Sequence, residues 1–318
     1  MRSSRILAGL GNAHRNLGLV LALLTVMAGF SVAAPSFASA DNLFAILHAM
    51  GPSTLAATGM ALVILTGKID ISIGSIAFLS ASTGALMMEA GYGPLAGFAA
   101  ILGLGTVLGA VNGFLVAYLR INALIATLGT MMAYRGIGLI FTDARVIPLP
   151  ETMRSMANTT IGPIFIDTIA VFAVVMAIQV LHRSTGFGRA LTAVGNGEDI
   201  AARIGLNTRR TVFLTFTLAG LLAALAACSS FIQVGSVSGF LGKGLEFNAI
   251  AIAVVGGISL AGGRGTIVPG VLIGAAAFQM ISNGLNQVNA DPYIYQLVTG
   301  AVIFVAMYMD AFKRTPAR

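Results

Sequence analysis

Ten apolar runs follow one another along the chain, with little polar sequence between them. A helix needs about 20 predominantly apolar residues to cross the hydrocarbon core of a bilayer. The pattern therefore predicts an all-α polytopic membrane protein with about ten transmembrane helices and no room for a separate extramembrane domain. The predicted spans are Leu17–Ala34, Leu43–Thr66, Ile71–Ala90, Pro94–Leu119, Ala123–Phe141, Ile164–Leu181, Val212–Val234, Asn248–Ala261, Thr266–Ile281 and Tyr293–Met309.

Three of these runs are irregular. Leu43–Thr66 contains Gly51-Pro52, and a proline removes a backbone donor and clashes with the preceding turn. Asn248–Ala261 and Thr266–Ile281 are short, and a glycine-rich tetrapeptide separates them. Irregular backbone at membrane depth survives where it lines a cavity or is buried in protein, so broken spans indicate a transport pathway. The alternative is a helix that is kinked for structural reasons alone.

Composition supports the membrane prediction. Only 9% of the 318 residues are charged and 57% are apolar, whereas soluble domains carry about 25% charged residues. The 39 glycines also exceed average usage. Some recur at every fourth residue and place small side chains on one helical face, which permits close helix packing. These are Gly105, Gly109 and Gly113 in one span, and Gly270 and Gly274 in another.

The N-terminal run has features of a signal peptide. Arginines precede Leu17–Ala34, and Ala38-Ser39-Ala40 resembles a signal-peptidase site. The apolar core of a cleaved signal has about 7–15 residues, and this run is longer. We therefore predict an uncleaved first span.

The 18 basic residues predict the orientation. With the N-terminus in the cytoplasm and ten spans, most of them fall on the cytoplasmic side, as the positive-inside rule requires. Both termini are thus predicted to be cytoplasmic. The net charge of +7 is then explained by topology, since no basic stripe with interleaved aromatics indicates nucleic-acid binding. The cytoplasmic set is Arg2, Arg5, Arg15, Lys68, Arg120, Arg183, Arg189, Arg203, Arg209, Arg210, Arg264, Lys313, Arg314 and Arg318; Arg145, Arg154 and Lys243 fall outside, and Arg135 lies within a span.

The first polar stretch of interest is Thr66–Ser75, between the second and third spans. In a turn, Lys68 and Asp70 could neutralise each other, and Ser72 and Ser75 could cap the following helix. The stretch is either a gate or pathway element or only a capped interfacial turn. The pathway and gate candidates in this half of the chain are Asp70, Ser72, Gly74 and Asn112.

The second stretch, Gly256–Gly265, superficially resembles a phosphate loop. It does not contain GxxxxGK[ST], and neither does the rest of the sequence, so the chain has no recognisable cradle for ATP phosphates. If ATP drives this protein, another subunit must bind ATP and magnesium. Its pathway candidates are Gly257, Ser259, Gly262 and Gly263.

The third stretch, residues 186–207, is predicted to lie in the cytoplasm. It contains a short helix that opens near Asn196, with acidic residues in its first turn and Gly205 at its C-terminus. Ala201-Ala202 would give this helix a small-residue face for contact with a cytoplasmic partner. The alternative is a solvated connector.

The sequence contains little that could support catalysis or metal binding. Cys228 can form no internal disulfide, and His14, His48 and His182 stand too far apart for metal-ligand spacing. No paired carboxylates, HExxH motif or Ser/His/Asp set is visible. Arg135 lies clearly mid-span; it is a functional candidate by its depth, or it pairs with backbone carbonyls. We expect no enzyme activity and no cofactor bound by this chain.

Taken in order, these stretches resemble the permease subunits of bacterial ABC importers for monosaccharides, a ribose/xylose/arabinose-type family that includes autoinducer-2 permeases. The resemblance runs from about Met60 to Asp310. One departure is Lys68, where many relatives have glycine. Its landmarks are Gly67–Ser75, Ala126–Thr130, Gly195–Gly205, Gly244-Leu245-Glu246 and Gly256–Gly265.

The resemblance implies a single permease domain over residues 1–318, with two inverted halves formed by spans two to five and seven to ten. It implies a pair of permeases, identical or paralogous, above two ATPase subunits, and a periplasmic sugar-binding protein that delivers the solute. Residues 186–207 would then hold the coupling helix that docks in the ATPase. The residues that would couple the chain to the ATPase are Gly195, Asn196, Glu198, Asp199, Ala201, Ala202 and Gly205.

The expected function is therefore import of a monosaccharide or similar small polar solute, coupled to ATP hydrolysis in a separate subunit. The alternative is an ion-coupled secondary transporter that works alone. Such a transporter should have an intramembrane proton or sodium site. A membrane scaffold without transport is a third class.

Overall fold

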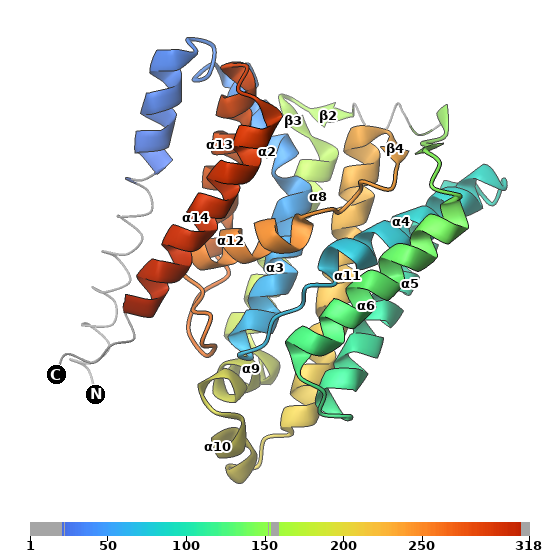
Figure 1. Cartoon of the computed structure of the whole chain (residues 1–318), viewed down its shortest axis with the longest axis vertical. Helices are drawn as coiled ribbons and strands as arrows, with labels where there is room; N and C mark the ends of the chain where they lie inside the picture. The colour runs from blue at the N-terminus through green and yellow to red at the C-terminus, as the bar shows by residue number, and fades with distance from the viewer. Residues whose placement is uncertain (1–20, 22, 152, 154–158, 313–318) are drawn as a thin grey trace.

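Helices make up most of the computed structural model, which describes residues 21, 23–151, 153 and 159–312 (Figure 1). The predicted all-α class is thereby confirmed except for four strands of two residues each. The helices are α2 Ala40–Ala49, α3 Gly51–Leu65, α4 Ile73–Glu89, α5 Gly93–Ala117, α6 Ala123–Thr142, α8 Ile166–Ser184, α9 Gly186–Asn196, α10 Glu198–Arg203, α11 Thr208–Val234, α12 Leu245–Val255, α13 Gly270–Gln287 and α14 Pro292–Phe312.

Within the described part of the chain, four helices are long and apolar enough to cross a membrane, namely α5, α6, α8 and α11, and the bent pair α2–α3 passes the same test as one span. The membrane prediction is thus supported, while the count of ten spans remains a prediction. The span predicted at Asn248–Ala261 is wrong as a simple crossing. Its helix, α12, has 11 residues. A helix of this length is about 16 Å long, against about 30 Å of hydrocarbon.

The predicted break at Gly51-Pro52 is confirmed. Helices α2 and α3 meet at 45° with only Met50 between them. Pro52 lies in the first turn of α3, where its missing N–H costs no helical hydrogen bond. The first predicted span starts at Leu17, outside the described residues, and a helix occupies Leu23–Ala33 within it.

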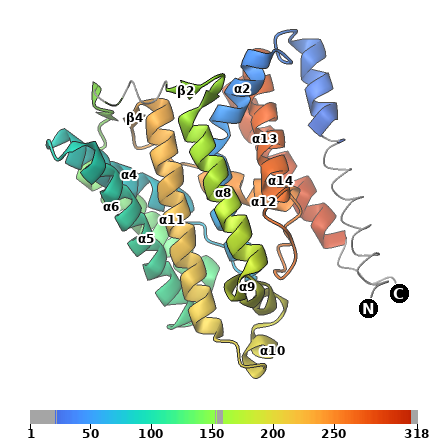
Figure 2. The same ribbon diagram turned by 180° about the vertical axis from the view of Figure 1, so that it is seen from behind.

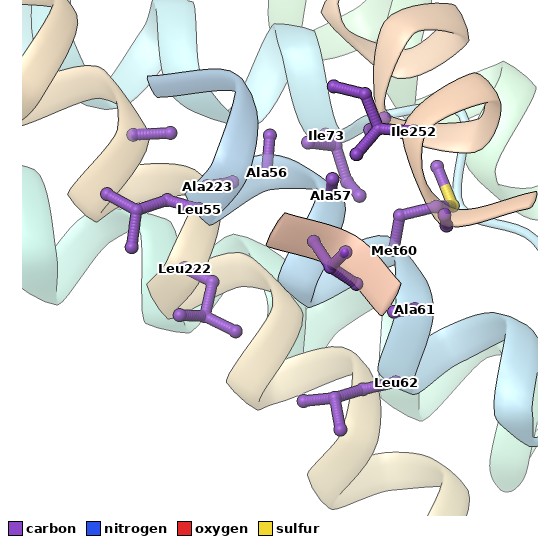
Figure 3. Close-up of a cluster of buried hydrophobic side chains, with 14 of the residues drawn as sticks. Leu55, Ala56, Ala57, Met60, Ala61, Leu62, Ile73, Leu222, Ala223 and Ile252 are labelled. Carbon is purple, nitrogen blue, oxygen red and sulfur yellow. The ribbon is translucent and has the colours of Figure 1, made fainter. Parts of the chain in front are cut away.

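Helix α3 forms the centre of the molecule. Almost all of its residues are buried, in keeping with a sequence that is apolar around the whole helix. Met60 packs there in one cluster with Leu222 of α11 and Ile252 of α12 (Figure 3). The core therefore surrounds the second half of the bent span.

The spaced glycines produce the predicted close packing. A Cβ added to Gly109 of α5 would lie 2.8 Å from the Cα of Gly220 in α11. A Cβ added to Gly274 of α13 would lie 3.2 Å from the backbone nitrogen of Gly256. Neither position has room for a larger residue, so these helices touch backbone to backbone.

The strands lie at the end of the molecule opposite α9 and α10 (Figure 1). Strand β1 (Ile147–Pro148) pairs antiparallel with β4 (Ser236–Val237), and β2 (Thr160–Ile161) pairs antiparallel with β3 (Ile164–Phe165). The first pair ties the loop after α6 to the end of α11. The second is a hairpin that leads into α8.

Candidate functional site

Three glycine-rich segments, far apart in sequence, meet where α3 ends. The backbone N–H of Gly263 donates to the carbonyl of Leu65 at 3.0 Å. A Cβ on Gly262 would lie 2.7 Å from the nitrogen of Gly67, and one on Gly195 would overlap the carbonyl oxygen of Leu65. We call these five residues the glycine junction. It brings all three stretches singled out in the sequence into one place.

Asn196 strengthens the junction from the α9 side. Its side-chain amide donates to Thr192 within the helix at 2.9 Å and to the carbonyl of Gly263 at 3.3 Å. Helix α9 was not predicted from the sequence, which suggested only one short helix opening near Asn196. Its apolar face packs Leu191 and Val194 into the body, a helical period that could have predicted it.

Helix α10 follows α9 after a single residue, Gly197, whose φ is 156°. Its end at Gly205 is as predicted. Gly205 has φ 85°, its N–H donates to Ala202, and the N–H of Leu206 donates to Ala201. This pair of bonds is the Schellman arrangement, which satisfies carbonyls at a helix C-terminus.

The predicted small-residue face of α10 is wrong. Ala201 is 1% exposed and packs inward, whereas Ala202 is exposed on another side of the helix. Residues one apart on a helix point about 100° apart, so they do not share a face. The large apolar residues exposed here are Ile200 (66%) within α10 and Ile204 (69%) at its C-cap, neither of which was among the predicted coupling residues.

Lys68 and Asp70 do not neutralise each other, contrary to the first interpretation of Thr66–Ser75. The Nζ of Lys68 instead lies 2.9 Å from Oε2 of Glu198 at the start of α10. Asp70 turns inward and is fully buried. The turn between α3 and α4 thus sends one charge to α10 and the other into the protein.

Asp70 belongs to a buried polar group. Its Oδ1 accepts from the backbone N–H and the hydroxyl of Ser72, at 2.9 and 2.6 Å, while Oδ2 has no partner. The amide of Asn112 donates to the same hydroxyl at 2.6 Å, and the Tyr134 hydroxyl donates to the Asn112 side chain at 3.4 Å. We call Asp70, Ser72, Asn112 and Tyr134 the Asp70 group. Capping by Ser72 is wrong, because its hydroxyl serves Asp70 and makes no cap bond.

The other pathway candidates lie apart from this group. A Cβ on Gly74 would clash with the backbone of Gly242, so α4 and the loop before α12 touch directly there. Ser259 donates its backbone N–H to the carbonyl of Arg264 and shapes the loop after α12, next to Gly257, whose φ is 89°. Among the candidates, the structure therefore joins Asp70, Ser72 and Asn112, and separately joins Gly262 and Gly263.

A cavity of about 730 Å³ opens beside the Lys68–Glu198 ion pair. Its wall comes from the α3–α4 turn, the α5–α6 loop, α10 and the first residues of α11. Charges of both signs line it: Lys68, Arg120 and Arg209 together with Glu198 and Asp199.

Arg135 binds backbone carbonyls, one of the two interpretations of this mid-span charge. Its guanidinium donates to Leu241 at 2.8 Å and to Gly239 at 3.3 Å, and it lies 4.7 Å from the ring centre of Phe78. These contacts fix the loop between β4 and α12 against α6.

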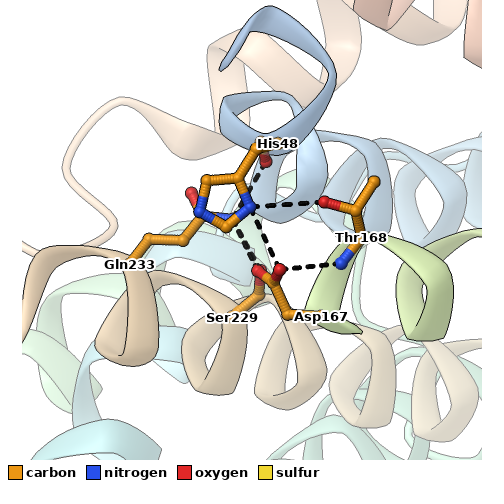
Figure 4. Close-up of polar contacts among 5 residues, drawn as sticks. All are labelled: His48, Asp167, Thr168, Ser229 and Gln233. Carbon is orange, nitrogen blue, oxygen red and sulfur yellow. Dashed lines mark hydrogen bonds and ion pairs between the residues drawn. The ribbon is translucent and has the colours of Figure 1, made fainter. Parts of the chain in front are cut away.

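A second polar group holds the other end of α3 (Figure 4). The Nδ1 of His48 lies 3.0 Å from Oδ1 of Asp167 and 3.3 Å from the Thr168 hydroxyl. The Gln233 amide donates to the other Asp167 oxygen at 3.0 Å, to the His48 carbonyl at 3.0 Å and to Ser229 at 3.2 Å. We call these five residues the His48 cluster. It ties the bend between α2 and α3 to α8 and α11.

An apolar helical body with a bent span and a short exposed helix between two long apolar helices defines a polytopic membrane protein. The chain belongs to the family described as "Branched-chain amino acid transport system / permease component", whose profile matches residues 42–307. Its relatives are transport subunits. This profile, together with the ribose and autoinducer 2 permeases described next, confirms the predicted resemblance to permeases of monosaccharide ABC importers.

Two kinds of curated relative illustrate the similarity. The ribose import permease protein RbsC of Escherichia coli (strain K12) is 35% identical over 304 residues, 93% of each chain. The autoinducer 2 import system permease protein LsrC of Yersinia pseudotuberculosis serotype O:1b (strain IP 31758) is 34% identical over 296 residues, 93% of this chain and 84% of that one. No solved structure matches the chain.

Proposed function

We propose that this chain is the transmembrane permease subunit of an ABC importer that moves a monosaccharide or similar small polar solute across the bacterial inner membrane. The names of its relatives, for ribose and autoinducer 2, support this solute class. Hydrolysis of ATP takes place in a separate ATPase, and a periplasmic binding protein delivers the solute. A second permease, identical or paralogous, completes the membrane part.

The observation that carries the proposal is the exposed helix α10. Two isoleucine side chains are exposed there, Ile200 in the helix and Ile204 at its C-cap. The helix stands at one extremity of the molecule (Figure 2). Exposed apolar side chains close together mark a surface for a partner. We assign α10, with the end of α9, as the helix that docks on the ATPase.

The distribution of basic residues supports a cytoplasmic location for this end. The α9–α10 segment, the ends of α3, α5 and α8 and the start of α11 lie at the same extremity (Figures 1 and 2). By the positive-inside rule this end faces the cytoplasm, and both termini then do as well. The bases in these segments are Lys68, Arg120, Arg183, Arg189, Arg203, Arg209 and Arg210.

The Asp70 group is our proposed element of the pathway. It lies where the chain passes between α3 and α4 through a non-helical turn, and such breaks at depth are typical of transport pathways. The ten spans and the two inverted halves belong to the same proposal.

Co-purification tests the assignment of α10. The affinity-tagged permease is expressed together with the ATPase and periplasmic binding protein of a monosaccharide importer from the same bacterium, and the amount of ATPase retained on the permease is measured. Replacing Ile200 and Ile204 together with Asp should reduce the retained ATPase at least severalfold, because apolar anchors dominate interface energy. The matched control is Ile161→Asp, which changes an isoleucine 64% exposed at the opposite end.

Equal retention by the Asp variant and the control would refute docking through α10. Failure of the unmodified permease to retain any ATPase would refute the importer assignment as a whole.

One observation favours the ion-coupled alternative. Asp70 is a buried acid with an unpartnered oxygen, and ionisable groups at depth mark proton or ion routes in carriers. Uptake measured in cells with an uncoupler distinguishes the two. An importer continues while ATP is maintained, whereas an ion-coupled carrier stops as the gradient collapses.

A further inference from the structure

Helix α10 has a side-chain link to the α3–α4 turn in addition to its packing. The Lys68 Nζ and the Glu198 Oε2 lie 2.9 Å apart although the residues are 130 positions apart in sequence. The lysine side chain is 19% exposed and the glutamate 48%. The bond therefore crosses from a well-held turn to the outermost helix of the molecule.

The two partners differ in how firmly they are held. Lys68 lies next to Gly67 of the glycine junction and two residues before the buried Asp70. Glu198 begins a helix of six residues that is joined to α9 through Gly197 and is seated on the body by Ala201. A movement of α10 thus reaches Lys68 through its ion pair, while the junction itself holds α9.

Hydrogen bonds of the α3–α4 turn connect the position of Lys68 to the interior of the protein. Asp70 is bonded to Ser72, and Ser72 accepts from Asn112 of α5. A shift of Lys68 is therefore carried within four residues to the point where α4 begins and α5 is contacted. The Asp70 group is the element that this shift would rearrange.

The Lys68–Glu198 ion pair is weak enough to form and break during a transport cycle. A partly exposed salt bridge contributes little to folding, because solvent screens it and both side chains lose freedom. The neighbouring cavity, lined by Arg120, Arg209 and Asp199, leaves room for both side chains to separate.

We propose that the Lys68–Glu198 ion pair transmits the position of α10 to the α3–α4 turn, which makes both residues positioning residues of the transport cycle. The proposal rests on the proposed function. It adds that the chain carries a charge-based link between its outermost helix and the α3–α4 turn.

Hydrogen–deuterium exchange with charge reversal tests this link. The variants are Lys68→Glu, Glu198→Lys and the double swap, with Lys68→Arg as the conservative change. In the purified permease, each single reversal should speed exchange at residues 198–203 by about two- to fivefold, the scale of a partly exposed ion pair. The swap and Lys68→Arg should restore the slower exchange. Unchanged exchange in both single reversals would overturn the proposal without reference to any partner.

The same variants are then studied in complex with the ATPase. Trapping with ATP and vanadate should alter exchange at both 198–203 and 66–72 in the unmodified chain. In Lys68→Glu, which leaves the docking helix unchanged, the response at 198–203 should persist while that at 66–72 falls. A full response at 66–72 in this variant would contradict the link.

The Arg145–Glu89 ion pair at the opposite end provides the matched control. Its atoms lie 2.6 Å apart, and both side chains are exposed. Reversal of Arg145 should leave exchange at 66–72 and 198–203 unchanged. If the unmodified permease shows no ATP response at 198–203, the importer assignment fails, whereas a lost link with an intact ATP response concerns only the ion pair.

Discussion

The two ends of α3 are held by different chemistry. At its C-terminal end the glycine junction brings backbone against backbone: Gly195 and Gly262 are too close to their neighbours for any side chain, and Gly67 has a left-handed backbone with φ 75°. At its N-terminal end the His48 cluster uses side chains that satisfy one another through hydrogen bonds (Figure 4). At the close backbone contacts, any residue larger than glycine is excluded because of its size. In the polar cluster, side chains of different size can fit, provided that they supply the hydrogen-bond donors and acceptors that their neighbours need.

The two ends of α3 should also behave differently during transport. The glycine junction joins α3 to α9 and to the loop after α12, so these segments move together or not at all. The His48 cluster joins the bend of the span to α8 and α11 through bonds that can be exchanged one at a time. We therefore expect α9 to move rigidly with the end of α3, whereas α10 follows through the Lys68–Glu198 ion pair and the opposite end of α3 has adjustable geometry.

The largest expected effect comes from Gly195→Ala. The new methyl group would overlap the Leu65 carbonyl and the Gly263 nitrogen. Overpacking of a well-packed contact costs typically about 1–3 kcal/mol, and more where backbone must move. The fraction of monodisperse protein after detergent extraction should fall sharply in size-exclusion chromatography.

The control is Gly136→Ala, a second helical glycine with nothing within 4 Å of an added Cβ. This variant should extract as well as the unmodified protein or better, because alanine favours a helix by about 0.5–1 kcal/mol. Equal extraction of both variants would show that the junction is looser than the structure indicates.

An intermediate effect is expected for Gln233→Met. The change keeps the length of the side chain but leaves Asp167 and the His48 carbonyl without their amide donor. A partner left unsatisfied in a fully buried site costs about 1–3 kcal/mol, and this cluster is half-buried, so the Tm in detergent should fall by less than that full penalty implies. Gln296→Met, at an exposed position of α14, is the control and should leave the Tm unchanged. A similar Tm for both variants would show that the hydrogen bonds of Gln233 do not stabilise the fold.

The smallest effect is expected for Arg145→Gln. This variant breaks two short bonds to Glu89, at 2.7 and 2.6 Å, yet both side chains are exposed. Exposed ion pairs contribute little because solvent and salt screen them. The Tm should stay within experimental scatter. A fall as large as that of Gln233→Met would mean that bond length rather than burial decides the stability at this end.

Much of the fold was predictable because the bilayer leaves few options. The bend at Gly51-Pro52, the packing faces of Gly109 and Gly274 and the helix end at Gly205 follow from local rules that need no partner. The crossing predicted at Asn248–Ala261 failed because hydropathy counts apolar residues without showing that α12 ends at Val255. Helix α9 was missed since its apolar face is narrow and its glycines weaken the helical signal.

The candidate site was only partly predictable. Asp70 and Ser72 are close in sequence, but Asn112 and Tyr134 reach them through tertiary packing of α5 and α6. The first partner suggested for Lys68 was its neighbour Asp70, because a sequence displays only nearby charges. The true partner, Glu198, lies 130 positions further along the chain.

The sequence by itself determined that this protein lies in a lipid bilayer, that it is helical, and which segments carry its unusual residues. Apolar run length, glycine spacing and proline act locally, so they can be interpreted without a structure. Only the tertiary structure decided that the three glycine-rich stretches form one junction and that Lys68 links to α10. Contacts of that kind depend on how helices cross in space, and no local pattern records which distant backbone or charge will be the neighbour.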